Sequence, residues 1–241
     1  LRNKVLKLSD KGEDIVNGVF LIREGLPINS FYLSRSAGVD PATGDQLYWA
    51  YKKDASGNMI EGSEYVTNNA TAASGSKYVS GCRIPDIYGS LSSNFSWKGL
   101  DFAVLFTYSL GGKVFDNIYR SLMEPSFIGQ TYHKNVLRSW SRAGEVTDVP
   151  KALTTLSTLA SDRFLVDASY FAVKNISLGY TLPSALLSGA GIESLRVYLS
   201  CDSPWIFTSL KGMNPQADFS GSTSYSYTPN RTLNLGVDLK F

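Results

Sequence analysis

The final stretch of this 241-residue chain, from Arg231 to Phe241, alternates apolar side chains with polar side chains or glycine. Successive side chains of a strand point to opposite faces, so the apolar ones share one face of an extended strand. A strand of about 9–11 residues with one wholly apolar face matches the thickness of a bilayer, whereas soluble strands usually run about 5–6 residues. This segment predicts the closing strand of a transmembrane β-barrel. Its apolar residues are Leu233, Leu235, Val237, Leu239 and Phe241.

Four further segments repeat the alternation and are expected to be antiparallel strands, which makes the predicted fold class all-β. Just upstream of the segment 176–182, the apolar residues fall on the opposite set of alternate positions, which predicts a β-bulge near Lys174 and Asn175. The polar faces are small and hydroxylic, whereas a face exposed to water normally carries more charge. Lipid is therefore the expected neighbour of the apolar faces, and the alternative is a soluble sandwich that buries them. The four segments are 87–98, 100–110, 176–182 and 195–202.

The connections between these strands alternate in length. Residues 97–100 read as a tight hairpin in which Gly99 supplies the positive φ of the turn. The link 183–191 is also short, whereas 112–163 and 207–230 are long. This alternation is typical of outer-membrane barrels, which have short periplasmic turns and long extracellular loops. The residues expected at the periplasmic end are Trp97, Leu100, Tyr180 and Phe241, of which Phe241 is also the expected barrel assembly signal.

Composition and single residues exclude several functional classes. With 23 basic and 21 acidic residues, the chain carries a formal charge of +2, which argues against nucleic acid as a partner. No apolar run approaches the roughly 20 residues of a membrane helix. His133 is the single histidine, so no metal site, no cofactor and no catalytic set of an enzyme is expected. Cys82 and Cys201 could pair in an oxidising periplasm, but two separate buried thiols are the preferred interpretation.

The remaining segments are less regular. A strand is expected at 31–34, turns at 40–45 and 52–58, and an exposed loop or frayed strand end at 66–77. Helical spacing predicts one helix at 132–141, whose shared face would make contacts inside a folded loop. That face contains Val136, Leu137 and Trp140.

Several motifs occur in a fixed order along the chain. They are Gly38–Asp45, Pro85–Leu91 (P-D-I-Y-G-S-L), Asn94–Asp101 (N-F-S-W-K-G-L-D), Asp167–Pro183 and Gly212–Pro215 (G-M-N-P). Together they resemble the signature of the SusC/RagA family of TonB-dependent outer-membrane transporters, over nearly the whole chain. One departure is the segment Cys201–Trp205, where the family usually has an Asn-Leu pair; it affects the expected shape of the following loop.

The resemblance implies that residues 1–241 are the carboxy-terminal part of a TonB-dependent receptor barrel domain, without its plug and amino-terminal regions. The complete barrel of such a family member has about 22 strands and a plugged lumen. Members lie in the outer membrane of Gram-negative bacteria. They import glycans or peptides with a SusD-like surface lipoprotein, and TonB supplies the energy. Partners would also include outer-membrane lipid. Alone, the fragment is not expected to transport.

Two sets of candidate residues follow from the expected faces and loops. The expected role of the lumen-facing set is hydration and contact with the plug, rather than ligand binding. This set is Asp101, Thr107, Arg196, Tyr198, Asp202, Asn234, Asp238 and Lys240. The second set consists of loop aromatics that could stack on sugar rings or pack beneath the lipoprotein, although packing within the loop is preferred for each. This set is Trp140, Trp205, Tyr225 and Tyr227.

The alternative function is that of a soluble or surface-attached β-sandwich, such as a binding or adhesin domain, which would dissolve without detergent as a compact monomer. A simple diffusion porin is a nearer rival and would lack a plug in the parent protein. A phospholipase or protease barrel would need a catalytic set that one histidine does not complete.

Overall fold

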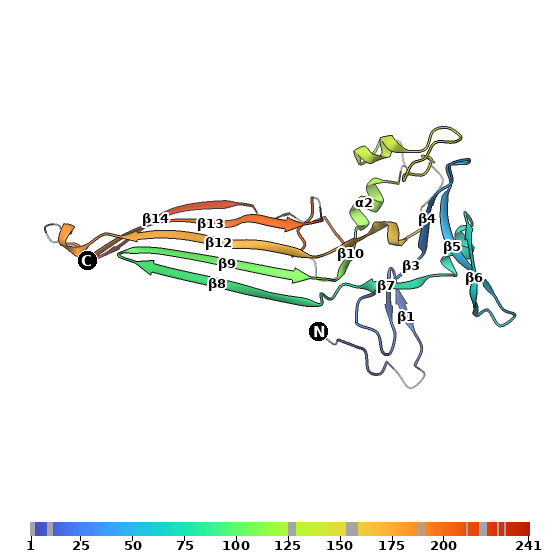
Figure 1. Cartoon of the computed structure of the whole chain (residues 1–241), viewed down its shortest axis with the longest axis horizontal. Coiled ribbons are helices and arrows are strands. Elements are labelled where there is room, and N and C mark those ends of the chain that lie inside the picture. The colour runs from blue at the N-terminus through green and yellow to red at the C-terminus, as the bar shows by residue number, and fades with distance from the viewer. Residues whose placement is uncertain are drawn as a thin grey trace. The chain divides into compact units, whose positions relative to one another are not determined.

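The computed structural model describes residues 3–8, 12–124, 129–152, 159–187, 189, 191–210, 212–216, 221–225, 227–228 and 230–241. The structure is mostly β, as predicted, and divides into two compact units (Figure 1). We call them the small-sheet unit (Leu1–Ile84, Lys113–Val166 and Asp218–Tyr225) and the long-strand unit (Pro85–Gly112, Asp167–Ala217 and Ser226–Phe241). No helix in the described part of the chain is long and apolar enough to cross a membrane.

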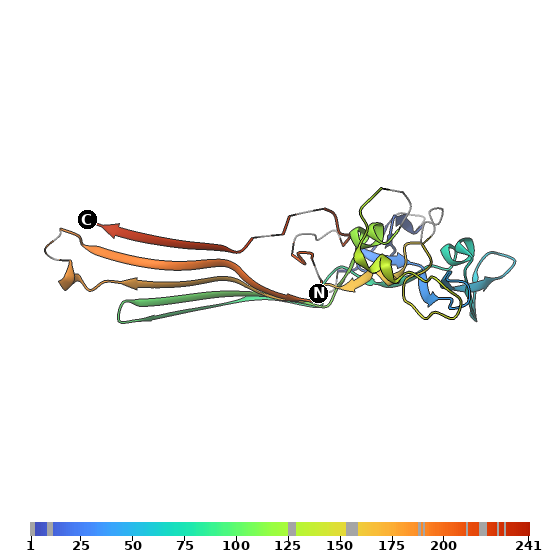
Figure 2. The same ribbon diagram turned by 90° about the horizontal axis from the view of Figure 1, so that it is seen from above.

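The long-strand unit is one antiparallel sheet with the order β14-β13-β12-β9-β8, and two views show its strands side by side (Figures 1 and 2). All five predicted strands are present, which confirms the reading of the alternation. The strands are β8 (Ile87–Trp97), β9 (Leu100–Leu110), β12 (Tyr170–Thr181), β13 (Ser194–Thr208) and β14 (Thr232–Lys240).

Strand β13 runs beyond its predicted end at residue 202. Its outer part pairs with β12, so that Trp205 lies opposite Val173. Ser203 has a positive φ of 50° and precedes Pro204. These two residues interrupt the alternation, so the sequence pattern did not predict the part of the strand that follows them. Pairing with β14 ends at Asp202. Pro204 therefore lies where β13 has a free edge, the position at which a sheet tolerates proline.

The predicted bulge and hairpin are both confirmed. The register of β12 shifts between Val173 and Asn175 relative to both of its neighbours. In the β8–β9 turn, Lys98 and Gly99 have φ values of 49° and 87°, the pattern of a two-residue type I′ hairpin. A Cβ on Gly99 would lie 2.6 Å from the Thr181 carbonyl oxygen, so this turn also needs glycine for space.

The two short connections lie at one end of the sheet. The β12–β13 link contains the 3-10 turn η3 (Ser184–Leu186), and the β8–β9 hairpin is beside it in register. The predicted common end is confirmed, because one row of paired residues contains Trp97, Leu100 and Tyr180, and Phe241 follows the end of β14. We call this the hairpin end. Its periplasmic location stays a prediction.

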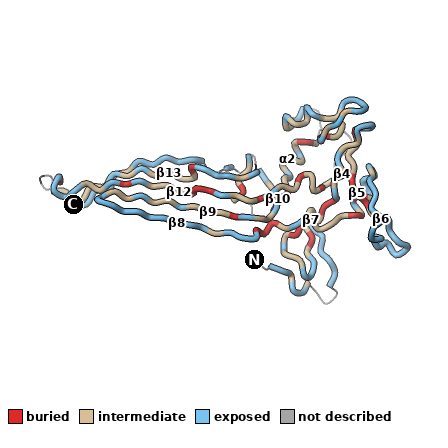
Figure 3. The backbone as a smooth tube through the Cα atoms, in the orientation of Figure 1, coloured by how far each residue is buried: buried red, intermediate tan, exposed pale blue. Residues whose placement is uncertain are grey.

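The apolar face of the long-strand sheet is not buried. Figure 3 shows the long strands as exposed or intermediate over most of their length. Leu235 and Leu233 in β14 are 77% and 68% exposed, and Val104 and Phe106 in β9 are partly exposed. Inward-facing residues of a sandwich are buried between two sheets. The exposure of this face is therefore unlike that of a sandwich core.

The described part of the small-sheet unit contains three sheets of short strands, and two of them are antiparallel. One has the order β1-β2-β3-β7, one β4-β5-β6 and one β10-β11. The strands are β1 (Ile15–Asn17), β2 (Phe20–Ile22), β3 (Ser30–Leu33), β4 (Arg35–Val39), β5 (Gln46–Lys53), β6 (Met59–Thr67), β7 (Tyr78–Cys82), β10 (Lys113–Phe115) and β11 (Leu165–Asp167). The helices are α1 (Ala70–Ser74), α2 (Asn117–Leu122), and the 3-10 turns η1 (Lys134–Arg138) and η2 (Asp162–Phe164).

A hydrophobic core joins distant segments of this unit. Phe115 and Phe164 meet edge to face, with ring centroids 6.4 Å apart. Burial of such side chains contributes roughly 1.5–3 kcal/mol each, so these contacts stabilise the unit. The buried members of the core are Phe31, Leu33, Phe115, Met123, Val149 and Phe164.

Two local predictions in this unit were wrong. The helix expected at 132–141 is only the 3-10 turn η1; Val136 packs on the core, but Leu137 is 91% exposed. A 3-10 turn has three residues per turn, so the helical face on which the prediction rested does not form. The segment 66–77, expected to be an exposed loop or a frayed strand end, does begin with the end of β6 at Thr67. It also contains the unexpected helix α1, because the Asn69 side chain accepts hydrogen bonds from the first free backbone N–H groups of the helix.

The other local predictions agree with the structure. The strand expected at 31–34 is β3, and the turns expected at 40–45 and 52–58 connect β4 to β5 and β5 to β6. Cys82 and Cys201 are separate free thiols, as expected. Both are half-buried rather than fully buried, because each lies in a strand with one accessible face.

Candidate functional site

A charged cluster lies on the polar face of the long-strand sheet, near the hairpin end. Arg196 on β13 donates from Nε and Nη2 to the two carboxylate oxygens of Asp101 on β9, at 3.0 and 2.7 Å. Its Nη1 donates to Asp238 on β14 at 3.0 Å. The guanidinium carbon lies 4.9 Å from the ring centroid of Tyr198. The structure thus brings together four residues of the predicted lumen-facing set.

Gly179 makes the Arg196–Asp101 pair possible. Strand β12 lies between β9 and β13, and Gly179 is in register with Asp101 on one side and Tyr198 on the other. A Cβ on Gly179 would come within 2.6 Å of Arg196 Nη2 and of Asp101 Oδ1. The bidentate ion pair therefore crosses over β12 at the one position without a side chain, and it ties three strands together.

Gly236 has the same role beneath an aromatic ring. It pairs with Tyr198, and a Cβ there would overlap the phenol ring. Neither Gly179 nor Gly236 was chosen as a candidate from the sequence. A glycine inside a strand pattern marks a close approach of other groups, and this signal could have identified both.

The other predicted polar residues are also paired within the unit. Asp202 accepts hydrogen bonds from Asn175 at 2.7 Å and from Asn234 at 3.2 Å. Lys240 forms an ion pair with Glu193 at 2.6 Å. The hydroxyl of Thr107 accepts from Gln216 Nε2 at 3.3 Å. We call this whole set the polar wall. The predicted lumen-facing set lacked three of its members: Asn175, which lies in β12, and Glu193 and Gln216, which lie in connections. The polar wall is defined by Asp101, Thr107, Asn175, Glu193, Arg196, Tyr198, Asp202, Gln216, Asn234, Asp238 and Lys240.

A cavity of about 90 Å³ lies at the bulge of the long-strand sheet. Lys174, Ser203 and Trp205 line it from the strands, and Met213 and Gln216 from the link that follows β13. The Lys174 ammonium donates to the side-chain oxygen of Gln216 across it. Sites for small molecules usually have about 300–1,000 Å³, so the cavity as it stands is too small for an oligosaccharide or a peptide.

The predicted loop aromatics lie in different surroundings. Trp140 packs inside the small-sheet unit, with its ring against Gly44 and its Nε1 donating to the Pro41 carbonyl at 2.9 Å. Tyr225 and Tyr227 are fully or nearly fully exposed. Trp205 was expected in a loop but lies in β13, because the strand resumes after the bulge.

The face of Trp205 follows from its pairing. It lies opposite Val173 and therefore on the apolar face of the sheet, where the Arg231 guanidinium carbon is 6.0 Å from its ring centroid.

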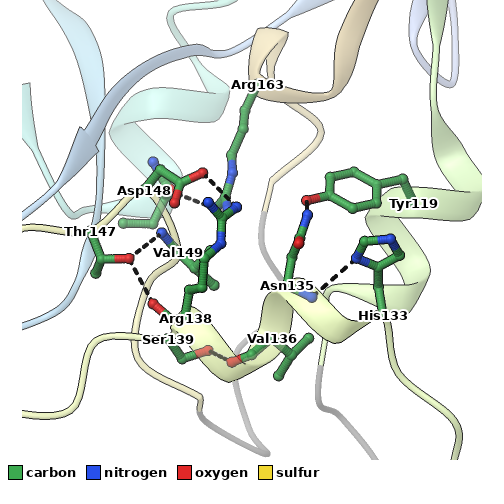
Figure 4. A network of polar contacts seen from close by, with 11 residues as sticks. Tyr119, His133, Asn135, Val136, Arg138, Ser139, Thr147, Asp148, Val149 and Arg163 are labelled. Carbon is green, nitrogen blue, oxygen red and sulfur yellow. Dashed lines mark hydrogen bonds and ion pairs between the residues drawn. The ribbon is translucent and has the colours of Figure 1, made fainter. Parts of the chain in front are cut away.

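The only histidine has a structural role in the described part of the small-sheet unit (Figure 4). His133 Nδ1 accepts a hydrogen bond from the backbone N–H of Asn135 at 3.1 Å and caps η1. Its ring meets Tyr119 edge to face at 4.9 Å, and the Tyr119 hydroxyl accepts from Asn135 Nδ2 at 2.8 Å. Farther along, Arg138 pairs with Asp148 at 3.2 Å. These contacts fold the segment back on itself.

The turn between β4 and β5 anchors the same segment through a carboxylate. Asp45 forms an ion pair with Lys151 at 2.8 Å and accepts from Asn68 Nδ2 at 3.0 Å. The hydrogen bond from Lys151 and, next, that from Asn68 hold the pKa of the Asp45 carboxyl below its usual range. No group of three or more His, Cys, Asp or Glu side chains suited to a metal ion occurs in the described parts of either unit.

Comparisons with known proteins agree with this geometry, although no family model matches the chain. The chain is 27% identical over its whole length to TonB-dependent receptor P3 of Formosa agariphila, of which the match covers 26%. It is 27% identical over 90% of its length to TonB-dependent receptor SusC of Bacteroides thetaiotaomicron, of which the match covers 20%. The chain thus spans about a quarter or less of the length of these relatives.

Two solved structures give the same result. The match to the structure of the RagAB peptide transporter covers 94% of this chain and 24% of the transporter chain, with a TM-score of 0.80 and 29% sequence identity. The match to the structure of the RagAB peptide importer in the "open-open" state covers 99% of this chain and 25% of the importer chain, with a TM-score of 0.82 and 28% sequence identity. The resemblance predicted from the motifs is therefore confirmed: this chain is similar, over its whole length, to part of the TonB-dependent receptors of the SusC/RagA family.

Proposed function

We propose that the chain forms the carboxy-terminal part of the β-barrel wall of a SusC-type, TonB-dependent nutrient transporter in the outer membrane of a Gram-negative bacterium. The observation that carries this proposal is the contrast between the two faces of the long-strand sheet. One face is apolar and exposed, and the other bears the polar wall. A barrel that turns its apolar face to lipid and its polar face to a lumen has this arrangement.

Aromatic side chains at both ends of the apolar face support the proposal. At the hairpin end, Trp97, Tyr180 and Phe241 are exposed. At the opposite end, Phe171 lies 5.5 Å from Phe106 and 6.3 Å from Phe207, measured between ring centroids. Membrane barrels have aromatic girdles at both interfaces of their apolar band. The aliphatic residues between the two ends are Leu91, Val104, Leu178, Leu199 and Leu235.

In this proposal the polar wall lines the lumen and contacts the plug of the parent protein. Arg196 is already bound by two carboxylates, so its role is to hold the strands together rather than to bind substrate. The small-sheet unit is formed by the chain before β8 and by the long links between strands, which we place on the extracellular side. A SusD-like lipoprotein would dock there, and TonB would act through the plug. The imported substrate is a glycan or a peptide.

The assignment of faces can be tested by cysteine accessibility in the full-length receptor in intact outer membranes. In a background without other accessible thiols, Leu235→Cys tests the apolar face and the adjacent Asn234→Cys tests the polar wall. We expect a membrane-impermeant maleimide to label Asn234→Cys through the lumen and to spare Leu235→Cys. A lipid-soluble maleimide should label Leu235→Cys. Labelling of Leu235→Cys by the impermeant reagent at the rate of Asn234→Cys would overturn the proposal.

Transport itself can be tested by substrate uptake into cells that express the receptor with its adjacent lipoprotein. We expect uptake of one glycan or peptide class to require both the receptor and TonB. Uptake that persists without TonB would instead indicate a diffusion porin.

A further inference from the structure

We propose that Arg231 and Trp205 form a binding site for the phosphate group of a membrane lipid, at the end of the sheet opposite the hairpin end. This inference rests on the proposed function, because it requires lipid beside the apolar face. Arg231 immediately precedes β14, and its guanidinium carbon lies 6.0 Å from the ring centroid of Trp205, a residue on the apolar face. It is exposed, as is Trp205.

The contacts of Arg231 fix its position but do not neutralise its charge. Nη2 donates to the Pro204 carbonyl oxygen at 2.6 Å, and the guanidinium carbon lies 6.0 Å from the Trp205 ring centroid. Both partners are uncharged. Among the described residues, no carboxylate lies within ion-pair distance of Arg231.

The lack of a carboxylate partner at Arg231 contrasts with the pairing of Arg196 on the polar face of the same sheet. Arg196 is neutralised by Asp101 and Asp238, whereas Arg231 is the arginine on the apolar side. An unpaired charge is costly in hydrocarbon. Arg231 should therefore lie at the level of the lipid headgroups, where the available counter-ion is a phosphate.

The geometry fits that ligand. A guanidinium has five N–H donors in a planar fork that matches phosphate. The Pro204 carbonyl accepts from Nη2, which leaves donors of the fork for a bidentate contact. Trp205, Phe171 and Phe207 lie on the same face and offer amphipathic or apolar surface to the upper part of an acyl chain.

At the hairpin end, Lys98 lies over Trp97 with its Nζ 5.0 Å from the ring centroid. That pair lacks the rigid fork, because a lysine ammonium is a point charge on a flexible stem. We therefore assign the specific phosphate site to Arg231. Under the proposed orientation, its ligand belongs to the extracellular leaflet.

The test uses the full-length receptor purified in an uncharged detergent, with lipid binding measured by native mass spectrometry. The probes are a diacyl phosphatidic acid, a diacylglycerol with the same chains, and inorganic phosphate. The variants are Arg231→Gln, Arg231→Lys and, as a control with the same charge change, Arg142→Gln at an exposed position of the small-sheet unit.

We expect wild type and Arg142→Gln to bind phosphatidic acid about tenfold or more tightly than Arg231→Gln does, as for loss of a charge-assisted hydrogen-bond pair. Arg231→Lys should keep a preference for phosphatidic acid over diacylglycerol, but a weaker one. This variant retains the charge and so also serves if Arg231→Gln fails to fold.

Equal affinity of Arg231→Gln and wild type for phosphatidic acid would overturn the site, and so would an equal loss in Arg142→Gln. Competition by inorganic phosphate with no contribution from acyl chains would overturn the assignment to lipid and leave a free-anion site. Failure of every variant to bind either lipid would count against the proposed membrane location itself, which distinguishes the two failures.

Discussion

The replacement Leu235→Arg separates a lipid-facing sheet from a water-facing one by the size of its effect. Leu235 is 77% exposed on β14. If water covered this face, an exposed substitution would change the free energy of unfolding by about 0.5 kcal/mol or less. If lipid covers it, an arginine at the middle of the bilayer costs about 2–4 kcal/mol. The two environments therefore predict effects that differ several-fold.

The depth of Leu235 follows from the length of its strand. Strand β14 has 9 residues, which at about 3.4 Å per residue gives a length of about 31 Å. A tilt of about 40° projects this length to about 23 Å along the membrane normal, close to the apolar band of about 25 Å. Leu235 then lies about 13 Å from the level of Lys240, near the middle of the band. Leu239 lies only about 3 Å from that level, where an arginine costs about 0–1 kcal/mol.

The assay is guanidinium unfolding of the full-length receptor in lipid vesicles, followed by the loss of heat-modifiable mobility. Leu235→Arg should lower the unfolding free energy by about 2–4 kcal/mol and Leu239→Arg by about 1 kcal/mol or less. The matched control is Asn234→Arg, which puts the same side chain on the polar face beside Asp202 and should have little effect. Equal small effects at all three positions would refute the reasoning. A large effect at residue 234 with a small one at 235 would show that the faces are inverted.

Three further predictions concern the chain end and the loop anchor. Phe241→Ser should impair assembly in the outer membrane, and undiminished surface levels of the full-length variant would contradict this. Gly44→Ala should destabilise the packing of Trp140 by at least about 1–2 kcal/mol, because φ at Gly44 is +73° and a Cβ would overlap the indole ring. Tryptophan fluorescence and limited proteolysis of the full-length protein would detect the loosened packing. An unchanged emission spectrum and an unchanged cleavage rate would refute this prediction. The Asp45–Lys151 contact should weaken in acid, because the hydrogen bond from Lys151 holds the folded pKa of Asp45 below its ordinary value of 3.8. Its stabilising contribution is then present above pH 3.8 and is lost as the pH falls through the lower folded value. Asp45→Asn should remove this part of the acid sensitivity in hydrogen exchange of the segment around Lys151, and an unaltered pH profile would refute the link.

The long strands could be predicted because each has one face with a period of two over many residues. The bulge near residue 174 was predictable for the same reason, since one extra residue reverses the phase. The outer part of β13 was not, because Ser203 and Pro204 interrupt the alternation at the point where a second bulge-like distortion lies. Propensity rules treat proline as a strand end unless the partner strand is known to have stopped.

The small-sheet unit was largely missed because its elements are short. Strand β1 (Ile15–Asn17) and strand β10 (Lys113–Phe115) are too brief to show any period. They form because distant segments meet in one core, which contains Phe31, Phe115 and Phe164. The helix predicted at 132–141 failed for a related reason: Val136 packs on that core, whereas the chain beyond it turns away to place Trp140 on the β4–β5 turn. Tertiary contacts of this kind leave no local pattern.

For the polar wall, sequence parity supplied the residues but not their partners. Asp101, Arg196 and Asp238 were placed on one face by counting positions along each strand. Their pairing depends on the register of β9, β12 and β13, and the long link between β9 and β12 conceals that register. The structure supplies it and shows that Gly179 is the position that allows Arg196 to reach Asp101.

The distribution of counter-charges on this sheet argues for lipid independently of the exposed leucines. On a water-covered sheet, either face can hold an unpaired arginine, because water solvates it at little cost. Here Arg196, on the polar face, is paired with two carboxylates, whereas Arg231, on the apolar face, lies at the extreme end of β14. The segment of β14 between Leu233 and Leu239 has no charge on its apolar face. Charges are thus excluded from the middle of one face only, which is the pattern that a hydrocarbon layer on that face imposes.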